Sequence, residues 1–447
     1  MKKIGILGAG MVSMPIIRYL LDKKYEVSIA SDDLKRVEKE VYHYPNGHLV
    51  PLNVNNEAAL SNYIKEHDII VSLLPYVFHT IVAKECVKQA KHMVTTSYVK
   101  PEMQAMDAEA RKMGIAILNE MGLDPGIDHM SAMRIIDRIH AEGGKVEEFY
   151  SLCGALPAPE SSHDNPFRYK FSWSPKGVVL AGNNNAIYKK QGKIIETPTE
   201  NLFKDVFTID FPGLESLDVY PNRDSLSYID IYNIPETKTM FRGTMRYKGW
   251  CESLDVLKQL GMTLPVEENM TGMTYSDYIA SKINVKNTKA IKQQLADSLH
   301  IDIDAPAMQS LDFLGYFSDK AMNRICDSAY ELTSDLMIER MMLAASERDM
   351  IVMQHNFVAS YPSGKREMIV SRLLDYGIPN GDTSIARSVA LPAAIAVDML
   401  AQGKLTVTGV HRPLIPEIYN TILNQLATLG IHMQEQFGLD EKLMIDR

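Results

Sequence analysis

The stretch Ile4-Gly-Ile-Leu-Gly-Ala-Gly-Met-Val12 decides the fold of the amino-terminal part of this chain. An apolar run ends at Gly8, Gly10 follows two positions later, and an apolar helical pattern then covers residues 11–21. This pattern is typical of a buried parallel strand that turns tightly into a helix, where a pyrophosphate can bind backbone N–H groups. Ser13 replaces the third glycine of G-x-G-x-x-G, so the motif is incomplete. The prediction of a dinucleotide site therefore depends on the position of this motif at the start of a strand–helix–strand unit.

Length and composition limit the classes of protein that this chain can belong to. Its 447 residues indicate two or three domains, because single hydrophobic cores stop growing before this size. The formal net charge is −9 without a basic run, so nucleic acid and anionic membranes are not expected partners. The four cysteines are far apart and form no C-x-x-C pair, which predicts reduced thiols, a cytoplasmic location and no metal. The longest apolar run, residues 388–401, is too short to span a bilayer.

Strands and helices alternate after the first helix. Strands are expected at residues 26–30, 48–52, 68–74, 92–95 and 114–118. This alternation predicts an α/β fold with a doubly wound parallel sheet of the Rossmann type. Ligands of such sheets bind beyond the carboxyl ends of the strands, so Leu74 is expected to lie beside the cofactor.

The end of the second predicted strand bears on the choice of cofactor. Ser31 and Asp32 stand where a nucleotide-binding sheet meets the adenosine ribose. A carboxylate there accepts hydrogen bonds from the ribose hydroxyls and repels a 2′-phosphate, so Asp32 favours NAD over NADP. Ser31, however, occupies the position where the acid is commonly found. Lys35 and Arg36 are also near enough to meet a phosphate, so NADP stays possible.

Two later turns of the first domain carry polar residues. His79 follows the strand at 68–74, and we interpret it as a helix-start or packing residue rather than a catalyst. The segment Asn119-Glu-Met-Gly-Leu-Asp-Pro-Gly-Ile-Asp-His129 follows the strand at 114–118 directly. Its glycines, proline and aspartates predict a rigid turn before a helix, directed from the strand ends towards the cofactor.

The rest of the chain begins with a second α/β region near Lys145. A long irregular segment, residues 154–177, contains two cations interleaved with three aromatics, and loops of this length usually have a function. A strand expected at 239–247 contains Arg242, and an arginine beside a glycine suits the binding of a carboxylate, although a surface ion pair is the alternative. Residues 252–348 are predicted to be helical throughout, with caps and breaks near residues 274–276, Asn287 and residues 304–306. A hairpin is predicted from residues 350–359 and 365–374.

The predicted domains follow from these changes of pattern. We expect a dinucleotide-binding domain at residues 1–125, completed by about 390–447. An α/β substrate domain is expected at 126–250 with 349–389, and a helical insertion domain at 251–348.

Several blocks of the sequence, taken together and in order, resemble saccharopine dehydrogenase of the L-glutamate-forming type. The blocks are Gly8–Val12, Leu73–Val77 with His79, Thr96–Tyr98, Asn119–His129, Cys153–Pro159, Arg168–Ser174, Tyr220–Asp224 and Arg242–Thr244. The resemblance covers essentially the whole chain. It implies a nucleotide domain, a second α/β domain that carries substrate contacts and much of a dimer interface, and a helical domain. The chain is thus expected to form a homodimer.

The resemblance also implies a reaction. Saccharopine is oxidised with hydride transfer to NAD(P) and is cleaved to L-glutamate and 2-aminoadipate 6-semialdehyde, or is formed by the reverse reaction, in lysine metabolism. The fungal enzymes that this chain resembles have an arginine at the position of Asp32 and use NADP. The related half of the animal bifunctional enzyme has Ser-Asp there, as this chain does, and uses NAD. The resemblance therefore supports NAD.

Individual site residues follow from the family pattern. The residues implied to bind the substrate are Tyr98, Val99, Asp124, Arg223, Arg242, Gly243 and Thr244, helped by the loop of residues 168–174. Those implied to handle protons are Tyr98, Asp124 and Cys153. Those implied to bind the cofactor are Gly8, Ala9, Gly10, Met11, Val12, Ser31, Asp32, Asn53, Leu74, Thr96, Ser97, Asp124, Pro125, Gly126 and Ser174. None of the proton-handling residues is a strong base at neutral pH when its pKa is unperturbed.

Two other functions are considered. Carboxynorspermidine or carboxyspermidine dehydrogenase also makes or breaks a C–N bond, but its cationic substrate has one carboxylate and calls for acids more than for paired arginines. A regulator that senses NAD(H) without catalysis is the alternative of another class. The presence of Tyr98, Asp124, Arg223 and Arg242 argues against it.

Overall fold

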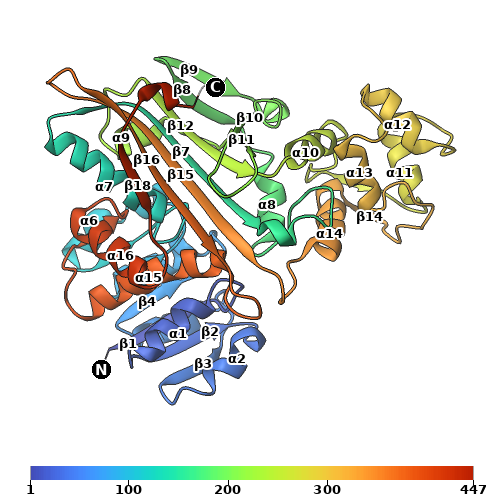
Figure 1. Ribbon diagram of the computed structural model, residues 1–447. Coiled ribbons are helices and arrows are strands. Elements are labelled where there is room, and N and C mark those ends of the chain that lie inside the picture. The colour runs from blue at the N-terminus through green and yellow to red at the C-terminus, as the bar shows by residue number, and fades with distance from the viewer. Residues whose placement is uncertain (1, 446–447) are drawn as a thin grey trace. The chain divides into compact units, whose positions relative to one another are not determined.

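The computed structural model describes residues 2–445, with only the backbone of Cys326. The chain forms two compact units, each built from two segments (Figure 1). Unit 1 comprises Met1–Gly144 and Ser371–Gln436, and unit 2 comprises Lys145–Val370 and Phe437–Arg447. Each unit is described by itself below.

Unit 1 is built around a parallel sheet of seven strands in the order β17-β6-β5-β4-β1-β2-β3, counted within the described residues. The strands are β1 (Lys3–Leu7), β2 (Glu26–Ser31), β3 (Gly47–Pro51), β4 (Ile69–Ser72), β5 (His92–Thr95), β6 (Ala116–Leu118) and β17 (Gly409–His411). Every neighbouring pair is parallel. The order reverses between β1 and β4, which confirms the predicted doubly wound α/β fold.

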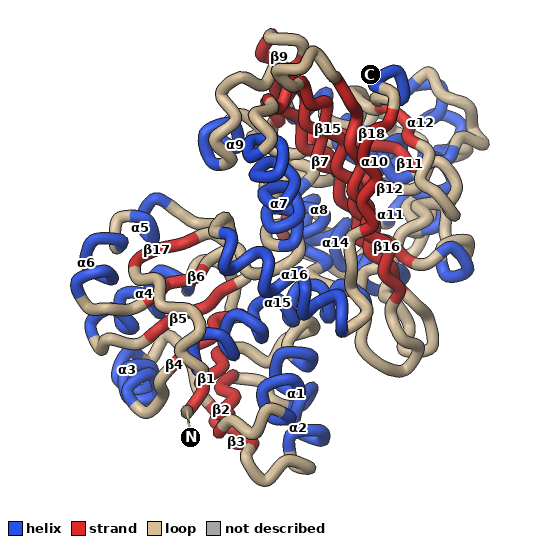
Figure 2. Tube along the Cα trace, turned by 60° about the vertical axis from the view of Figure 1, so that its left-hand side comes forward, coloured by secondary structure: helices blue, strands red, loops and turns tan. Residues whose placement is uncertain are grey.

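Helices cover both faces of this sheet (Figure 2). The helices of unit 1 are α1 (Met14–Asp22), α2 (Lys35–Val41), α3 (Glu57–Lys65), α4 (His79–Lys88), α5 (Pro101–Gln104), α6 (Asp107–Lys112), α7 (Ile127–Ala141), α15 (Ser384–Ala401) and α16 (Pro416–Thr428). One core joins Ile70 and Met93 of the sheet to Ile64 of α3 and Cys86 of α4, all fully buried. Helix α15 contacts β4 and β5.

Helix α15 is long and apolar enough to cross a membrane by length and composition, but 83% of it is buried inside the protein. Helices buried in the core of a globular protein pass the same test of composition. It packs against α1, and its Asp398 accepts a hydrogen bond of 2.6 Å from the hydroxyl of Tyr25, the residue before β2. We therefore describe it as a core helix of unit 1.

The first helix begins later than its apolar pattern indicates. The predicted helical stretch starts at residue 11, whereas α1 starts at Met14. Pro15 stands in the first turn of the helix, where a missing N–H costs nothing, and this favours a start just before it. The Ser13 hydroxyl donates to the Gly10 carbonyl over 2.8 Å and closes the turn. Residues 10–13 are therefore a turn.

Unit 2 contributes most of a nine-stranded mixed sheet. Its strands are β7 (Lys145–Pro157), β8 (Ala186–Lys190), β9 (Lys193–Thr197), β10 (Phe207–Ile209), β11 (Leu217–Pro221), β12 (Thr239–Arg246), β15 (Asp349–Ser360), β16 (Arg366–Tyr376) and β18 (Gln434–Leu439). The main order is β10-β11-β12-β7-β15-β16-β18, and β8 joins β9 to β12. Strands β15 and β16 are adjacent and confirm the predicted hairpin. Phe149 stacks on Phe357 with ring centroids 4.2 Å apart and packs one face of the sheet.

The helices of unit 2 lie between its strands in the sequence. They are α8 (Pro175–Ala181), α9 (Ser227–Ile231), α10 (Trp250–Gln259), α11 (Tyr275–Lys282), α12 (Ile291–Leu299), α13 (Pro306–Phe313) and α14 (Ala329–Met341). The prediction that residues 252–348 are helical throughout was wrong at two places, because β13 (Glu267–Asn269) pairs with β14 (Cys326–Ser328). Helix α10 ends at Gln259, before Gly261 with φ +69°, and the polar residues after Pro265 provide no apolar face for a further helix.

Candidate functional site

The predicted cofactor residues of unit 1 gather at one edge of its sheet. Gly8–Val12 follow β1, Ser31 and Asp32 stand at the end of β2, and Asn53 follows β3. Leu74 follows β4, Thr96 and Ser97 follow β5, and residues 124–126 follow β6. Because all these strands are parallel, their carboxyl ends lie at the same edge, where nucleotides bind in such folds (Figure 2). Ser174 belongs to unit 2, where it precedes α8 and is exposed.

The glycines of the first turn leave room for a phosphate. Gly8 has φ +109°, and a Cβ atom at this position would lie 2.9 Å from the Leu73 carbonyl oxygen. A side chain is therefore excluded at Gly8 by the neighbouring strand end. A Cβ atom at Gly10 would meet no described atom within 4 Å. The backbone at Gly10 thus borders open space, and the residues present fit a dinucleotide whose pyrophosphate approaches this turn.

The ribose end of this site carries an exposed acid. Asp32 is exposed, and its Oδ1 atom lies 3.3 Å from the Ser31 hydroxyl. No cation pairs with Asp32 among the described residues. Lys35 and Arg36 begin α2 and are exposed as well. The carboxylate of Asp32 is therefore available to ribose hydroxyls, while two cations stand three and four residues away.

His79 holds two hydroxyl groups at this edge, a role that was not foreseen from the sequence. Its Nδ1 atom lies 2.8 Å from the Ser72 hydroxyl, and its Nε2 atom lies 2.7 Å from the Ser97 hydroxyl. Burial, with a smaller contribution from the charge of Lys100, lowers the pKa of His79 to about 4. The ring is therefore neutral at pH 7, with one nitrogen that donates and one that accepts. His79 begins α4, as predicted for a helix-start residue, and in addition orients Ser97.

Tyr98 and Asp124 are brought together by the turns after β5 and β6. The Tyr98 hydroxyl donates to Asp124 Oδ1 over 3.1 Å. Both residues were predicted to contact the substrate and to handle protons. A phenol that donates to a carboxylate forms a short path along which a proton can move, and this places two predicted proton-handling groups in direct contact.

Glu120 connects the same two turns and was missed by the sequence analysis. Its Oε1 atom accepts from the Val99 backbone N–H over 2.8 Å and from Arg412 Nε over 3.0 Å. Its Oε2 atom lies 2.6 Å from His129 Nε2. Burial alone would raise the pKa of Glu120, but His129 and Arg412 outweigh it and hold the pKa below its usual value. The only signal in the sequence was a charged residue two positions after a buried strand.

The backbone between these residues is tightly packed. A Cβ atom at Gly126 would lie 1.9 Å from the Gly122 carbonyl oxygen, and one at Gly122 would lie 3.1 Å from the Pro125 carbonyl oxygen. The Ile127 N–H donates to the Gly122 carbonyl over 2.9 Å and leads the chain into α7. The predicted rigid turn before a helix is therefore confirmed.

The predicted substrate residues of unit 2 lie on adjacent strands. In the parallel pair β12–β7, Arg242 is opposite Ser151 and Thr244 is opposite Cys153. Side chains of directly paired residues point to the same face of a sheet. Arg242, Thr244 and Cys153 therefore share one face. A Cβ atom at Gly243 would lie 2.6 Å from Val219 Cγ1, so glycine is required between the two positions that were predicted to bind the substrate.

The two predicted arginine ligands differ in their surroundings. Arg242 is 4% exposed, and its guanidinium carbon lies 4.3 Å from the centroid of the Tyr228 ring. Its backbone N–H donates to the Ser225 hydroxyl over 2.9 Å. Arg223 is exposed and has a left-handed backbone with φ +49°. No carboxylate pairs with Arg223 in the part of the chain that the structure describes.

The aromatic segment 168–174 is anchored within unit 2. Arg168 makes a two-point ion pair with Glu215, with N–O distances of 2.5 and 2.6 Å, and stacks over Tyr247 at 4.6 Å. Lys170 pairs with both Asp164 and Glu347. Both cations of this segment therefore already have carboxylate partners.

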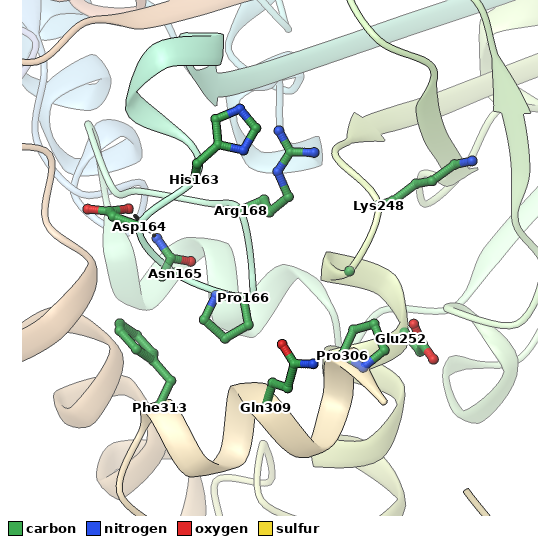
Figure 3. A pocket seen from close by; sticks show the side chains of 11 residues that line it. His163, Asp164, Asn165, Pro166, Arg168, Lys248, Glu252, Pro306, Gln309 and Phe313 are labelled. Carbon is green, nitrogen blue, oxygen red and sulfur yellow. Dashed lines mark hydrogen bonds between the residues drawn. The ribbon is translucent and has the colours of Figure 1, made fainter. Parts of the chain in front are cut away.

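A cavity of about 750 Å³ lies beside this segment (Figure 3). Pro166, Gln309 and Phe313 surround its centre, and Lys248 and Glu252 stand at its side. Arg168, from the loop expected to help bind saccharopine, lines it, but Tyr98, Asp124, Arg223, Arg242 and the other residues predicted to bind saccharopine do not. We therefore do not regard it as the catalytic site. Among the described residues, no group of three or more His, Cys, Asp or Glu side chains is arranged to hold a metal ion.

Two family models match this chain and together cover most of it. The model of the saccharopine dehydrogenase NADP binding domain matches residues 4–118. The model of the saccharopine dehydrogenase C-terminal domain matches residues 122–431. Domain models of one family therefore follow each other along the chain.

Full-length relatives are similar to the chain. The saccharopine dehydrogenases [NADP(+), L-glutamate-forming] of Schizosaccharomyces pombe and Saccharomyces cerevisiae are both 36% identical, over 99% and 97% of this chain and 100% and 99% of their own lengths. The mitochondrial alpha-aminoadipic semialdehyde synthase of Bos taurus is 36% identical over 96% of this chain and 47% of its own length.

A solved structure has the same fold over its whole length. It is the apo histidine-tagged saccharopine dehydrogenase (L-Glu forming) from Saccharomyces cerevisiae, with a TM-score of 0.89 and 35% sequence identity. The similarity covers 98% of this chain and 100% of that one.

Proposed function

This chain belongs to the saccharopine dehydrogenase family, and from that premise we propose that it catalyses the reaction of the L-glutamate-forming enzymes. It converts saccharopine, water and NAD(P)⁺ to L-glutamate, 2-aminoadipate 6-semialdehyde, NAD(P)H and a proton, or carries out the reverse reaction, in lysine metabolism. The observation that carries this conclusion is the full-length similarity to two enzymes with this activity at 36% identity.

The chemistry makes distinct demands on the protein. NAD(P), when bound, accepts a hydride from the carbon on the lysine side of the secondary amine. The amine loses its proton, the resulting C=N bond takes up water, and the C–N bond then breaks to release the amine of glutamate. The chain must therefore bind three carboxylates, accept protons near the amine, and hold water at the same carbon.

Tyr98 and Asp124 support the proton-handling part of this proposal. Their hydrogen bond of 3.1 Å lies at the carboxyl edge of the dinucleotide sheet, where a nicotinamide is expected. Asp124 steadies the protonated amine, and the Tyr98 hydroxyl passes a proton along the pair. We propose Cys153 of unit 2, which is 9% exposed and pairs across strands with Thr244, as the third proton-handling residue.

The carboxylates of the substrate are assigned to unit 2. Arg242 is buried on a strand, which limits its rotamers and preorganises a two-point bond to a carboxylate. Arg223 is exposed and makes no ion pair among the described residues, so its guanidinium is available to a second carboxylate. The Thr244 hydroxyl and the Gly243 backbone complete this set.

The chain binds NAD(P), and for the choice between the two cofactors we propose a preference for NAD. The exposed carboxylate of Asp32 would be repelled by the 2′-phosphate of NADP and can accept bonds from the ribose hydroxyls of NAD. The names of the fungal relatives state NADP(+), so this preference separates the chain from them. Asp32 supports this preference, whereas the names of the fungal relatives do not.

Two further properties are proposed from the sequence and the family likeness. We propose that the chain forms a homodimer, which a mass measurement by light scattering would decide. We also propose a cytoplasmic location. Cys86, Cys153 and Cys251 are free and buried, which suits a reducing compartment.

The decisive experiment follows absorbance at 340 nm with saccharopine and NAD, and separately with NADP. Reduced cofactor should appear only with saccharopine, and glutamate should form in equal amount. Carboxyspermidine serves as the comparison substrate, because a polyamine enzyme would prefer it. Binding of NADH without any turnover of either substrate would contradict an enzymatic function.

A further inference from the structure

Glu120 forms hydrogen bonds to the backbone on both sides of Tyr98, at Ser97 and at Val99. The Glu120 backbone N–H donates to the Ser97 carbonyl over 3.1 Å. Its carboxylate accepts from the Val99 N–H over 2.8 Å. These contacts enclose Tyr98, because Ser97 and Val99 are its neighbours in the chain. A single residue thus fixes the backbone on either side of the Tyr98 side chain.

The Glu120 carboxylate also fixes the loop that contains Asp124, through its contact with His129. His129 stands in the first turn of α7, and its Nε2 atom lies 2.6 Å from Glu120 Oε2. Asp124 lies in the short loop between Glu120 and α7. Both ends of that loop are therefore fixed by Glu120 and His129, and the loop positions the carboxylate that accepts the Tyr98 hydrogen bond.

The charge and backbone of Glu120 show that this arrangement is specific. Glu120 is 2% exposed and has φ +59°, a left-handed conformation that a residue with a long side chain rarely adopts. Burying a carboxylate is costly unless it is paired, and the pairing here comes from Arg412, 292 positions later in the chain. Three donors, one each from Val99, His129 and Arg412, converge on its two oxygens.

We infer that Glu120 is a positioning residue that sets the Tyr98 hydroxyl against Asp124. This inference rests on the proposed function, in which Tyr98 and Asp124 handle protons. Glu120 acts through its contacts with Val99, Ser97 and His129 and does not itself touch the substrate. An amide does not reproduce these contacts, since a glutamine lacks the negative charge that pairs with Arg412 and presents one acceptor oxygen and one NH₂ group in place of two acceptor oxygens.

The test combines kinetics with a double-mutant cycle. Glu120→Gln should lower kcat about tenfold, on the scale of one charge-assisted hydrogen bond, with the Kd of NADH unchanged within about twofold. In a Tyr98→Phe background the same substitution should lower kcat by less than about twofold, because the hydroxyl that it positions is already absent. Equal losses in both backgrounds would overturn the inference, since a general structural defect adds independently.

Asp398→Asn is the matched control. Asp398 is also in unit 1 and 4% exposed, but it accepts over 2.6 Å from Tyr25, the residue before β2. It therefore lies near the amino end of that strand, whereas the turns after β5 and β6 are at the carboxyl ends of the parallel strands. The Tm of Asp398→Asn should fall by about as much as that of Glu120→Gln, while its kcat should equal that of the wild type. A tenfold loss of kcat in this control would attribute the effect of Glu120→Gln to reduced stability and overturn the inference.

A crystal structure of Glu120→Gln separates this inference from the proposed function. If the wild type does not oxidise saccharopine, the proposed function fails, and the distance between Tyr98 Oη and Asp124 still decides the inference. Separation beyond hydrogen-bonding distance supports it. A pair unchanged at 3.1 Å overturns it, whatever the activity.

Discussion

The Nε2 atom of His79 lies 2.7 Å from the Ser97 hydroxyl, at the edge of the sheet where the dinucleotide is expected. The other ring nitrogen is bound to Ser72, and burial keeps the ring neutral, with a pKa of about 4. Protonation would turn both nitrogens into donors and remove the acceptor that one of the two hydroxyls needs. The edge of the site therefore depends on an uncharged imidazole.

His79 should make the stability of unit 1 sensitive to acid. Its pKa is about 4 in the folded chain and about 6.5 when unfolded, so between these values the unfolded chain binds more protons. The stabilisation is complete above pH 6.5 and is lost as the pH falls towards 4. Between pH 7 and 5 the wild type should lose about 2 kcal/mol more of its free energy of unfolding than His79→Gln. Urea unfolding at several pH values measures this difference. Parallel losses in the two proteins would contradict it.

Arg242→Ala should raise the KM for saccharopine by one to three orders of magnitude. The expected cost is about 1.5–3 kcal/mol, the range for a hydrogen bond to a charged group. Cofactor affinity should change little, since Arg242 belongs to β12 and not to the dinucleotide sheet. Initial rates at varied saccharopine and a separate NADH titration give both numbers. Loss of NADH binding with an unchanged KM would show that Arg242 is placed wrongly.

Arg168→Ala should act on stability rather than on the KM for saccharopine. Its ion pair with Glu215 is partly exposed, and its stacking on Tyr247 adds a cation–π contact. Together these predict a loss of about 1–2 kcal/mol in the free energy of unfolding. Denaturant unfolding measures the loss, and this variant is also the arginine control for Arg242→Ala. An increase of the KM equal to that of Arg242→Ala would contradict this prediction and indicate that Arg168 binds the substrate.

Asp32→Arg should shift the cofactor preference towards NADP. The substitution removes a repulsive carboxylate and adds a cation that can pair with the 2′-phosphate. We expect the ratio of kcat/KM values, NADP over NAD, to rise about tenfold or more, since a charge-assisted bond contributes about 1.5–3 kcal/mol. Asp33→Arg is the matched control, because Asp33 is exposed next to Asp32 but caps the Lys35 N–H over 3.0 Å. An equal shift in both variants would mean that only the overall charge matters.

Much of the first sheet could be predicted because its signals are local. Strand β5 was predicted with its observed bounds, His92–Thr95, and the turn at Gly8 and Gly10 was located from spacing alone. Short apolar runs bounded by glycine and proline are decided by neighbouring residues. The start of α1 was predicted too early, because the apolar pattern begins before the residues that the helix includes.

Pairings between distant segments could not be predicted in this way. Arg168 was expected to help bind the substrate, yet its carboxylate partner Glu215 lies 47 residues away in the sequence. Glu120 gave no local pattern, and its partner Arg412 lies 292 positions later. Only the fold shows which charged residues form ion pairs, because the local sequence around a charged residue does not indicate whether an opposite charge lies near it in space.

The close approach of Gly122 and Gly126 restricts how this enzyme can be altered. Since a Cβ atom at position 126 would overlap the carbonyl group of Gly122, no L-amino acid other than glycine can be accommodated there on this backbone. A mutant library aimed at new substrates should therefore keep both positions constant and vary Val99 or Thr244 instead. Any successful replacement at 126 would need a different loop path, and with it a different neighbour for Tyr98.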